Sequence, residues 1–421
     1  HDETFPTERL DQAYRDLIER HRVDRTYQPH SGTFYELTRK KTGGTRTGTR
    51  ELWTYASPEH YYRRKHYGAW GFAQSGGIGG ILAARDSLHQ MMPEDALWPV
   101  GVSEAWSFHT VIQGAEYYDA FMQALETRYG AAEDFDDFCR KAYAMNYNSA
   151  RGMYEAYARN KFEATGITTW KYNVAWPAAM TWQYVDWYPR ATAAYYGAKK
   201  ACEPLHVQFA YDDDRVYVLN GFYEDFKGLQ VSARAYDLEM NERYARQAMV
   251  DVDANGKAQV FGMERPEDEG EVYFVVLTLQ DTDGTERSRN VYWLSASPDI
   301  PGVSGHNADG LFYTKPKSSA DFTPLANLSD VSLETRMESV IEGGDTVVTA
   351  HVENPTPHIA FQVQLAVTPG EDTHEIAPTF WGDNYLCLLP GETREVRAAF
   401  PTTELDGAAP RLRVRGWNVT P

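Results

Sequence analysis

The hydrophobic pattern of this chain changes near Leu205, and the change restricts the folds that the sequence can adopt. Before it, short apolar runs such as Ala69–Ala73 and Ile167–Tyr172 alternate with segments of helical period such as Thr7–His21 and Tyr117–Tyr129, which indicates an α/β region. After Leu205 the predicted elements are strands with a period of two. The predicted fold class is therefore α/β followed by all-β.

The chain of 421 residues is too long for one ordinary hydrophobic core. We predict an α/β domain at 1–205, a β-sandwich at 206–300 and a second β-sandwich at 301–421. The Ser-, Pro-, Gly- and Asp-rich stretch Ser295–Ala320 is expected to be a linker or a long surface loop. The predicted strands of the two sandwiches are His206–Tyr211, Arg215–Leu219, Leu229–Tyr236 and Glu271–Leu279, then Val331–Met337, Thr346–Glu353, Ala360–Val367 and Thr393–Phe400.

The net charge of −19 excludes some classes of partner. Nucleic acids and anionic membranes are bound by Lys and Arg, which carboxylates outnumber here. The chain also lacks an apolar run of about 18 residues, so no membrane span is predicted. A neutral or cationic ligand fits the charge better, although such a charge also serves solubility.

The cysteines Cys139, Cys202 and Cys387 have no metal-type spacing, and we expect buried thiols. No metal and no cofactor is predicted. The compartment stays open between the cytoplasm and secretion, because the sequons at Asn327 and Asn418 are too short a pattern to decide it.

Aromatic residues are concentrated in one segment, Trp170–Trp187. It holds four tryptophans, at 170, 176, 182 and 187, and two tyrosines, at 172 and 184. Flat aromatic faces pack against the C–H faces of sugar rings, and the interleaved Asn173 or Asp186 can hydrogen-bond hydroxyls. The alternative is an ordinary aromatic core, since buried aromatics are common.

Two separated motifs resemble one family. Trp170–Pro177, with the run that continues to Leu205, resembles the last barrel strand and following helix of glycoside hydrolase family 2, in the branch of the β-mannosidases and exo-β-D-glucosaminidases. Phe380–Glu392 is similar to the C-terminal immunoglobulin-like domain of that branch. The resemblance implies the C-terminal half of a (β/α)8 barrel followed by two immunoglobulin-like β-sandwiches.

The resemblance also implies a general acid/base. The family places an Asn-Glu pair after barrel strand four, and Asp2-Glu3 matches it with Asp in place of Asn. Glu3 would protonate the glycosidic oxygen, and the neighbouring Asp2 would raise its pKa by like-charge repulsion. The alternative is that these acids form a solvated chain end.

The nucleophile position departs from the family. Tyr67–Phe72 resembles barrel strand seven, after which the family has a Glu, but here Ser75 stands at that place beside Gln74. A serine without an adjacent base is a poor nucleophile. Water could act with Glu51 or Glu104 as substitute carboxylate, the substrate could supply its own nucleophile, or the protein could bind sugar without cleaving it.

Further residues at predicted strand ends are expected to line the site, because barrel enzymes place function there. The glycine-rich run Gly76–Gly80 lacks a phosphate-binding pattern and is expected to pass close to a ligand or to a neighbouring strand. The complete set of predicted substrate-binding residues is Asp2, His30, Trp53, Tyr55, Gln74, Trp170, Asn173 and Trp176.

The predicted function is cleavage of a terminal β-linked hexose or hexosamine, such as a β-mannoside or β-glucosaminide. The alternative is a catalytically degenerate carbohydrate-binding or scaffolding subunit. If Glu3 follows strand four, a second polypeptide is expected to supply the first half of the barrel and the upstream β-domains, because half a barrel exposes an open edge and half of a core.

Overall fold

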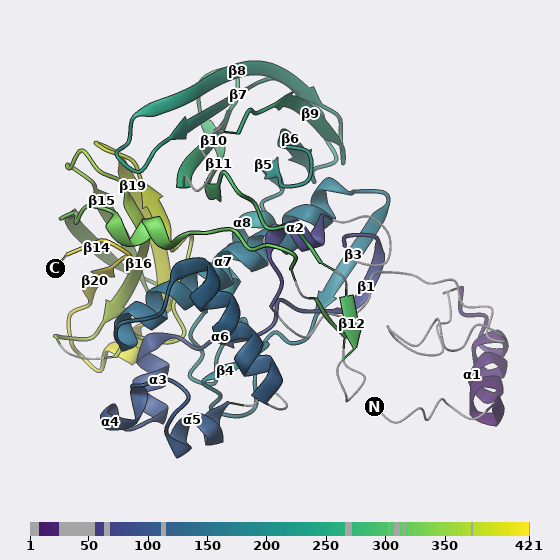
Figure 1. The fold of residues 1–421 in the computed structure, drawn as a ribbon, viewed down its shortest axis with the longest axis horizontal. Helices are drawn as coiled ribbons and strands as arrows, with labels where there is room; N and C mark the ends of the chain where they lie inside the picture. The colour runs from purple at the N-terminus through teal and green to yellow at the C-terminus, as the bar shows by residue number, and fades with distance from the viewer. Residues whose placement is uncertain are drawn as a thin grey trace.

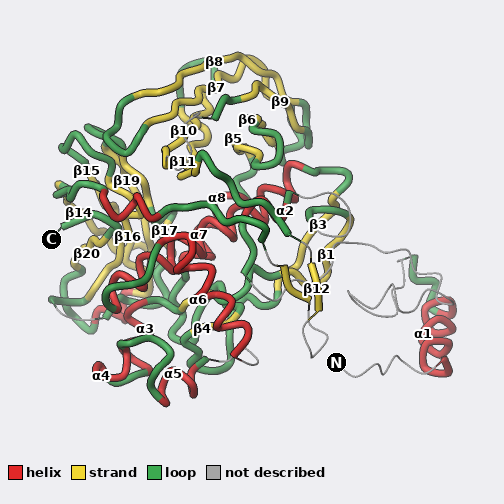
Figure 2. Tube along the Cα trace, in the orientation of Figure 1, coloured by secondary structure: helices red, strands yellow, loops and turns green. Residues whose placement is uncertain are grey.

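The structure is a computed structural model of the chain. It describes residues 8–24, 55–62, 68–110, 115–265, 272–302, 304–306, 312–314, 316–371 and 374–420. Helices lie mainly in the lower half of the molecule, and strands lie above and to the left of them (Figure 2).

The first part of the chain is helical with short strands. Its helices are α1 (Glu8–Arg20), α2 (Pro58–Tyr61), α3 (Arg85–Met91), α4 (Glu94–Leu97), α5 (Glu104–His109), α6 (Ala115–Tyr129), α7 (Phe135–Arg159) and α8 (Ala193–Ala201). Its strands are β1 (Gly71–Gly76), β2 (Ile81–Leu82), β3 (Ala164–Thr169) and β4 (Met180–Thr181).

Helix α7 is the central element of this region (Figure 1). The Asp134 carboxylate caps it by accepting the Asp137 N–H at 2.7 Å, and acidic residues in the first turn with Arg159 in the last complement the helix dipole. Most side chains of α7 are buried on all sides. Such burial is typical of a helix enclosed by other elements, not of a surface helix.

Strands β1 and β3 form a parallel pair in which Gly76 lies opposite Thr169. Strand β1 starts two residues after the start of the predicted Ala69–Ala73, and β3 starts three residues before the start of the predicted Ile167–Tyr172. Ala69 precedes β1 and donates its N–H to Tyr61, and residues beyond Thr169 leave β3 because the Lys171 N–H pairs with the Trp182 carbonyl at 2.8 Å. Strands β2 and β4 pair antiparallel nearby.

The first sandwich begins soon after α8 ends. Its two sheets have the strand orders β11–β10–β7–β8 and β5–β6–β9. The strands are β5 (Leu205–Ala210), β6 (Arg215–Asn220), β7 (Phe226–Tyr236), β8 (Glu242–Val252), β9 (Lys257–Gly262), β10 (Val272–Gln280) and β11 (Glu286–Ser295).

Strand β10 is apolar at consecutive positions because both of its faces are buried. Val275 and Leu277 belong to the core shared with β5 and β6, whereas Phe274 and Val276 belong to the core shared with the helices and the second sandwich. A strand covered on both faces has no polar alternation.

The segment Ser295–Ala320, predicted as a linker or a long surface loop, has some regular structure and buried contacts in its described part. It contains the short antiparallel strands β12 (Ser304–His306) and β13 (Phe312–Thr314) and is tied to α6, because the buried Asp299 pairs with the buried Arg128. Ala320 is buried too. Separating Asp299 from Arg128 would leave a buried charge without compensation, so this ion pair anchors the segment to the helical region.

The second sandwich has sheets of order β14–β15–β19–β17 and β18–β16–β20. Its strands are β14 (Glu334–Glu342), β15 (Asp345–Glu353), β16 (Ala360–Thr368), β17 (Phe380–Trp381), β18 (Leu386–Leu388), β19 (Thr393–Pro401) and β20 (Arg411–Arg415), with the 3-10 helices η2 (Thr323–Asn327) and η3 (Thr402–Leu405). Strand β14 starts later than predicted, because Val331 pairs with the end of the chain through Asn418.

Two other expectations need correction or detail. Cys139 and Cys387 are buried, but Cys202, at the end of α8, is exposed. Residues 77–80 of the glycine-rich run are buried. Gly80 accepts a hydrogen bond from the Asn146 side chain of α7 at 2.9 Å, so this run passes close to a helix.

A buried polar cluster joins α7 to the first sandwich. Glu155 of α7 accepts hydrogen bonds from Tyr292 and Asn290 of β11, both at 2.7 Å, and contacts His206 of β5 at 3.1 Å. His206 also contacts Glu203 at 3.1 Å. Because buried polar groups are costly unless they are paired, these contacts define how the two parts meet.

Candidate functional site

The candidate site lies where β1 and β3 end. In a parallel pair the carboxyl ends of both strands lie at the same edge, and the pairing of Gly76 with Thr169 brings the positions of Gln74 and Ser75 near the start of the aromatic segment. The backbone of Gln74 and Ser75 belongs to β1, whereas their side chains lie outside the described part of the structure.

The aromatic segment divides into exposed and buried residues. Trp182 and Tyr184 are 9% and 4% exposed. The exposed fractions of the other four are 49% for Trp170, 61% for Tyr172, 42% for Trp176 and 46% for Trp187. An ordinary aromatic core would bury all six residues. The segment therefore combines both alternatives, with two core residues and four residues that are exposed enough to form a sugar-binding surface.

Backbone hydrogen bonds hold the exposed aromatic residues in place. The N–H groups of Tyr184 and Val185 both donate to the Tyr172 carbonyl, at 3.0 and 2.9 Å, and Asn173 forms a bridge with Val185. The Lys171 amine lies 5.8 Å from the centre of the Trp170 ring. The segment thus folds back on itself and presents its large rings from a fixed backbone.

Helix α5 extends this surface. The Phe108 ring lies 5.2 Å from the Trp176 ring and is 64% exposed. His109 is anchored by a 2.6 Å contact between its Nδ1 and the Pro177 carbonyl. Trp106 points the other way and is fully buried, its indole N–H donating to Leu97 at 3.0 Å.

We call the exposed residues Trp170, Tyr172, Trp176, Trp187 and Phe108 the aromatic platform; among them, the Phe108 and Trp176 rings are in contact. Phe108 was not predicted. One signal is the sequence Trp106-Ser-Phe108-His109, because on a helix Phe108 lies on a different face from the apolar Trp106. The contact of α5 with the aromatic segment, however, depends on tertiary structure.

Asn173 is exposed beside the platform. Asp186, in contrast, is 3% exposed and accepts the N–H groups of Ala84, Tyr188 and Arg190 at 3.2, 3.0 and 3.0 Å. Burial raises the pKa of its carboxyl. Asp186 therefore shapes a loop and does not offer its oxygens to a ligand, which corrects that interpretation.

Tyr55 has a different environment from the one we expected. Its ring lies 4.9 Å from the Arg128 guanidinium, and it lines a small cavity with Glu59 and Asp299. Burial raises the pKa of its hydroxyl. The structure thus gives Tyr55 contacts with α6 and with the segment between the sandwiches.

The remaining predicted residues can be placed only in part. Glu104, the substitute carboxylate on α5, is exposed on the helix that carries Phe108. Asp86, the first acid after Ser75, is 4% exposed and bound to Arg413 at 2.6 Å, so it is committed to structure. The predicted site residues outside the described part of the chain are Asp2, Glu3, His30, Glu51 and Trp53.

Family models match both sandwiches. The mannosidase Ig/CBM-like domain matches residues 214–297, and the exo-β-D-glucosaminidase Ig-fold domain matches residues 311–419.

Similar proteins and structures cover most of the chain. An exo-β-D-glucosaminidase of Streptomyces avermitilis is 33% identical over an alignment of 378 residues that covers 86% of this chain and 41% of that protein. The Amycolatopsis orientalis protein of the same name is 32% identical over 380 residues, with 86% and 36% covered. The crystal structure of the Amycolatopsis orientalis exo-chitosanase superimposes with a TM-score of 0.86 at 28% identity, over 99% of this chain and 50% of that one. This chain therefore spans half or less of the length of these relatives.

The fold and the site define a modular protein in which two immunoglobulin-like sandwiches adjoin a helical region with an exposed aromatic surface. The motifs and the matches assign the chain to the β-mannosidase and exo-β-D-glucosaminidase branch of glycoside hydrolase family 2. Among the helices that the structure describes, none is long and apolar enough to cross a membrane.

Proposed function

We propose that this chain forms part of a glycoside hydrolase that cleaves terminal β-linked hexosamine or hexose. The observation that carries this proposal is the aromatic platform at the carboxyl edge of β1 and β3. Exposed rings with a fixed backbone can pack against a sugar ring, and exposed Asn173 can hydrogen-bond its hydroxyls. The relatives named exo-β-D-glucosaminidase support an aminosugar as substrate.

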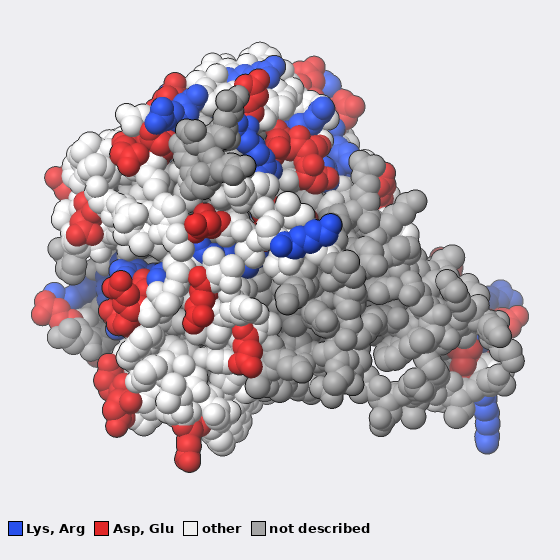
Figure 3. Space-filling view, viewed as in Figure 1, with Lys and Arg blue, Asp and Glu red and all other residues white. Residues whose placement is uncertain are grey.

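Charge around the platform differs between its two ends. Acidic side chains lie over the helices in the lower part of the molecule in Figure 3. Among the described side chains, the exposed acids on α4, α5 and α6 are Glu94, Asp95, Glu104, Asp119 and Glu126. Glu104 shares α5 with Phe108, whereas the Lys171 amine lies beside Trp170. A protonated amino group would therefore be attracted at the Phe108 end of the platform and repelled at the Trp170 end.

We further propose that β1 and β3 are two strands of a (β/α)8 barrel. A parallel pair needs cover on both faces and further strands at its edges. The other strands would come from outside the described residues, and a second polypeptide that supplies the first half of the barrel is our proposal for their source.

Glu3 is the proposed general acid/base, because its motif matches the Asn-Glu pair of the family. The Ser75 position offers no carboxylate, and no acidic residue lies between Lys65 and Asp86. Hydrolysis would then use water activated by another carboxylate, such as Glu51 or Glu104, with inversion at the anomeric carbon.

The missing carboxylate also supports the second candidate function, a catalytically degenerate sugar-binding or scaffolding subunit. This candidate and the first make opposite statements about turnover, so one set of assays separates them.

The test uses nitrophenyl β-glucosaminide, β-mannoside and β-galactoside with the complete protein and any partner that purifies with it. We expect release of nitrophenol from at least one substrate and a loss of about 100-fold or more in Glu3→Gln, because general acid catalysis contributes about that much. Glu19→Gln, an exposed acid on α1, is the matched control and should retain activity.

Equal activity in Glu3→Gln would remove Glu3 from the proposed role. Calorimetric binding of glucosamine without turnover of any glycoside would favour the degenerate subunit. The anomer first released, followed by NMR, distinguishes inversion from retention.

A further inference from the structure

A large groove separates α3 and α4 from the open face of the second sandwich. Its volume is about 1140 Å³, slightly above the range of about 300–1,000 Å³ that is usual for small-molecule sites. Its lining includes five arginines and three carboxylates, although the whole chain has 60 acidic and 41 basic residues. The local balance of charge is thus the reverse of the global one.

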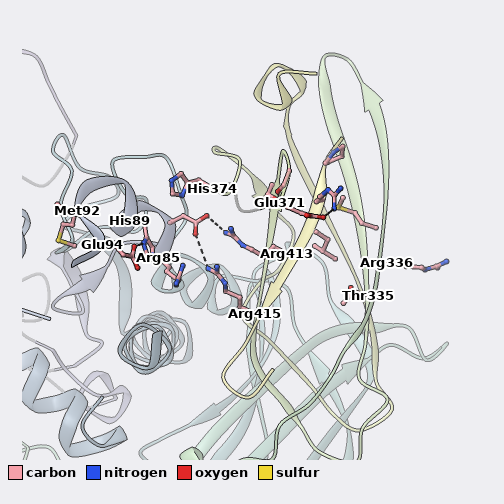
Figure 4. Close-up of a pocket in the computed structure, with 18 residues that line it drawn as sticks. Arg85, His89, Met92, Glu94, Thr335, Arg336, Glu371, His374, Arg413 and Arg415 are labelled. Carbon is pink, nitrogen blue, oxygen red and sulfur yellow. Dashed lines mark hydrogen bonds and ion pairs between the residues drawn. The ribbon is translucent and has the colours of Figure 1, made fainter. Parts of the chain in front are cut away.

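Strand β20 supplies three of these arginines. Arg411, Arg413 and Arg415 alternate with Leu412 and Val414, which pack against the hydrophobic core. Since alternate residues of a strand point to the same face, the three guanidinium groups leave the sandwich on one side. In Figure 4, Arg413 and Arg415 reach toward Arg85 and His374, whereas Arg336 projects away from them.

The carboxylates near this cluster are already committed. Asp86 accepts the Glu375 N–H and an Arg413 N–H, both at 2.6 Å. Asp136 pairs with Arg85 through two contacts of 2.5 and 3.3 Å. Of the other two lining carboxylates, Glu371 pairs with Arg411 and Glu94 with His89, at 2.5 and 2.8 Å. The guanidinium groups of Arg85, Arg413 and Arg415 thus outnumber the two carboxylates that they face, Asp86 and Asp136, by one.

Arg415 is the least engaged of the three. Its Nη1 lies 3.7 Å from Asp86 Oδ1, beyond hydrogen-bond distance, and its side chain is 40% exposed. Burial lowers the pKa of its guanidinium, and so does repulsion by Arg413 and Arg85. A planar guanidinium has a fork of N–H donors that matches the two oxygens of a carboxylate, phosphate or sulfate.

We propose that this groove, centred on Arg85, Arg413 and Arg415, binds an oxyanion-bearing ligand. The shared chemistry is a phosphate, sulfate or carboxylate group. The anion would bridge α3 and β20 and so join the helical region to the second sandwich. The groove is separate from the aromatic platform, and the proposal does not depend on hydrolysis.

The test is calorimetric titration of the complete protein with inorganic phosphate, with sulfate and with glucuronic acid, at constant ionic strength. We expect saturable binding of at least one probe and about tenfold weaker binding in Arg415→Ala, because a bidentate charge-assisted pair is lost. Arg397→Ala, an exposed arginine on β19 outside the groove, should bind as the unaltered protein does.

A purely structural role for Arg415 as a link to Asp86 would change stability without changing anion affinity. If Arg415→Ala does not fold, Arg415→Lys keeps the charge without the fork and should still weaken binding. Tighter binding of glucuronic acid than of the inorganic ions would identify an acidic sugar as the source. Absence of saturable binding by the folded protein, or equal affinity in the Arg415 variants and Arg397→Ala, would overturn the proposal.

Discussion

At the scale of single residues, the aromatic segment shows how neighbours of the same type take opposite roles. Trp176 is 42% exposed and Trp182 is 9% exposed, although six positions separate them. Their side chains therefore contribute to different quantities, surface recognition in one case and core packing in the other.

This division gives a direct prediction. Trp182→Ala should lower the free energy of unfolding by about 3–5 kcal/mol, because it leaves a cavity in the core. Trp176→Ala should cost less than about 1 kcal/mol of stability but weaken binding of a glucosamine disaccharide about tenfold, through lost ring stacking. Urea denaturation and calorimetry measure the two quantities.

Phe162→Ala is the matched control for that pair. Phe162 is 70% exposed but precedes β3, so it lies at the other end of the strand from the platform. It should change neither quantity. Sugar binding that survives in Trp176→Ala would contradict the assignment of the platform.

Asn418 is a second case in which the surroundings decide. Its sequon was left open by the sequence, but its side-chain amide donates to Ser329 at 2.7 Å and Ile359 at 2.9 Å and is buried. An oligosaccharide cannot be carried there in the folded state. Asn327 ends η2 and is exposed.

At the scale of elements, the packing of α7 against α8 depends on one glycine. A Cβ on Gly197 of α8 would lie 2.2 Å from the Tyr147 carbonyl oxygen of α7. The two helices therefore approach as closely as only glycine permits at that point.

We expect Gly197→Ala to lower the free energy of unfolding by about 1–3 kcal/mol. Overpacking at a backbone contact outweighs the roughly 1 kcal/mol that Ala gains over Gly in a helix. Gly262→Ala is the control, since its Cβ would meet its neighbours at 4.0 Å. A rise in stability of Gly197→Ala in urea denaturation would show that the helices can separate without cost.

Sequence patterns predicted the elements that bury one side and failed where tertiary contacts compete. Thr346–Glu353 became β15 within one residue, because it alternates clearly. The prediction Ile167–Tyr172 was displaced to Ala164–Thr169 because the Lys171 N–H pairs with Trp182, where the aromatic segment folds back on itself. Helix α7 was not among the segments that the sequence analysis named, although it is the longest described helix.

At the scale of the whole molecule, a buried ionic cluster joins the helical region to the first sandwich. Burial lowers the pKa of His206, but its hydrogen bonds with Glu155 and Glu203 outweigh burial and raise it overall. Lys200 pairs with Glu203 at 2.8 Å and with Asp383 at 2.9 Å, which extends the cluster to the second sandwich.

The raised pKa predicts a pH dependence of stability. A protonated His206 stabilises the folded state fully below its unfolded pKa of about 6.5, and this contribution is lost as the pH rises through the folded pKa. We expect the free energy of unfolding to fall as the pH rises above about 6.5 and His206→Gln to remove part of that fall.

Ser288→Ala is the control within the same cluster. Its hydroxyl donates to Glu203 at 2.8 Å and does not titrate in this range, so its removal should lower stability by the same amount at every pH of the range. Equal slopes of stability against pH in the unaltered protein and His206→Gln would contradict the assignment.

The sequence by itself determined where along the chain the type of secondary structure changes. Its periods indicated where helices give way to strands, and its motifs indicated the family, because these are local properties of side-chain order. It also gave the prediction, through the resemblance, that Ser75 stands where the family has a Glu.

Only the tertiary structure decided which aromatic residues face solvent and which arginines gather in one groove. Trp176 meets Phe108 across about seventy positions, and Arg415 meets Asp86 across more than three hundred. Exposure and local charge are sums over neighbours in space, and such neighbours are brought together only when the separate elements pack.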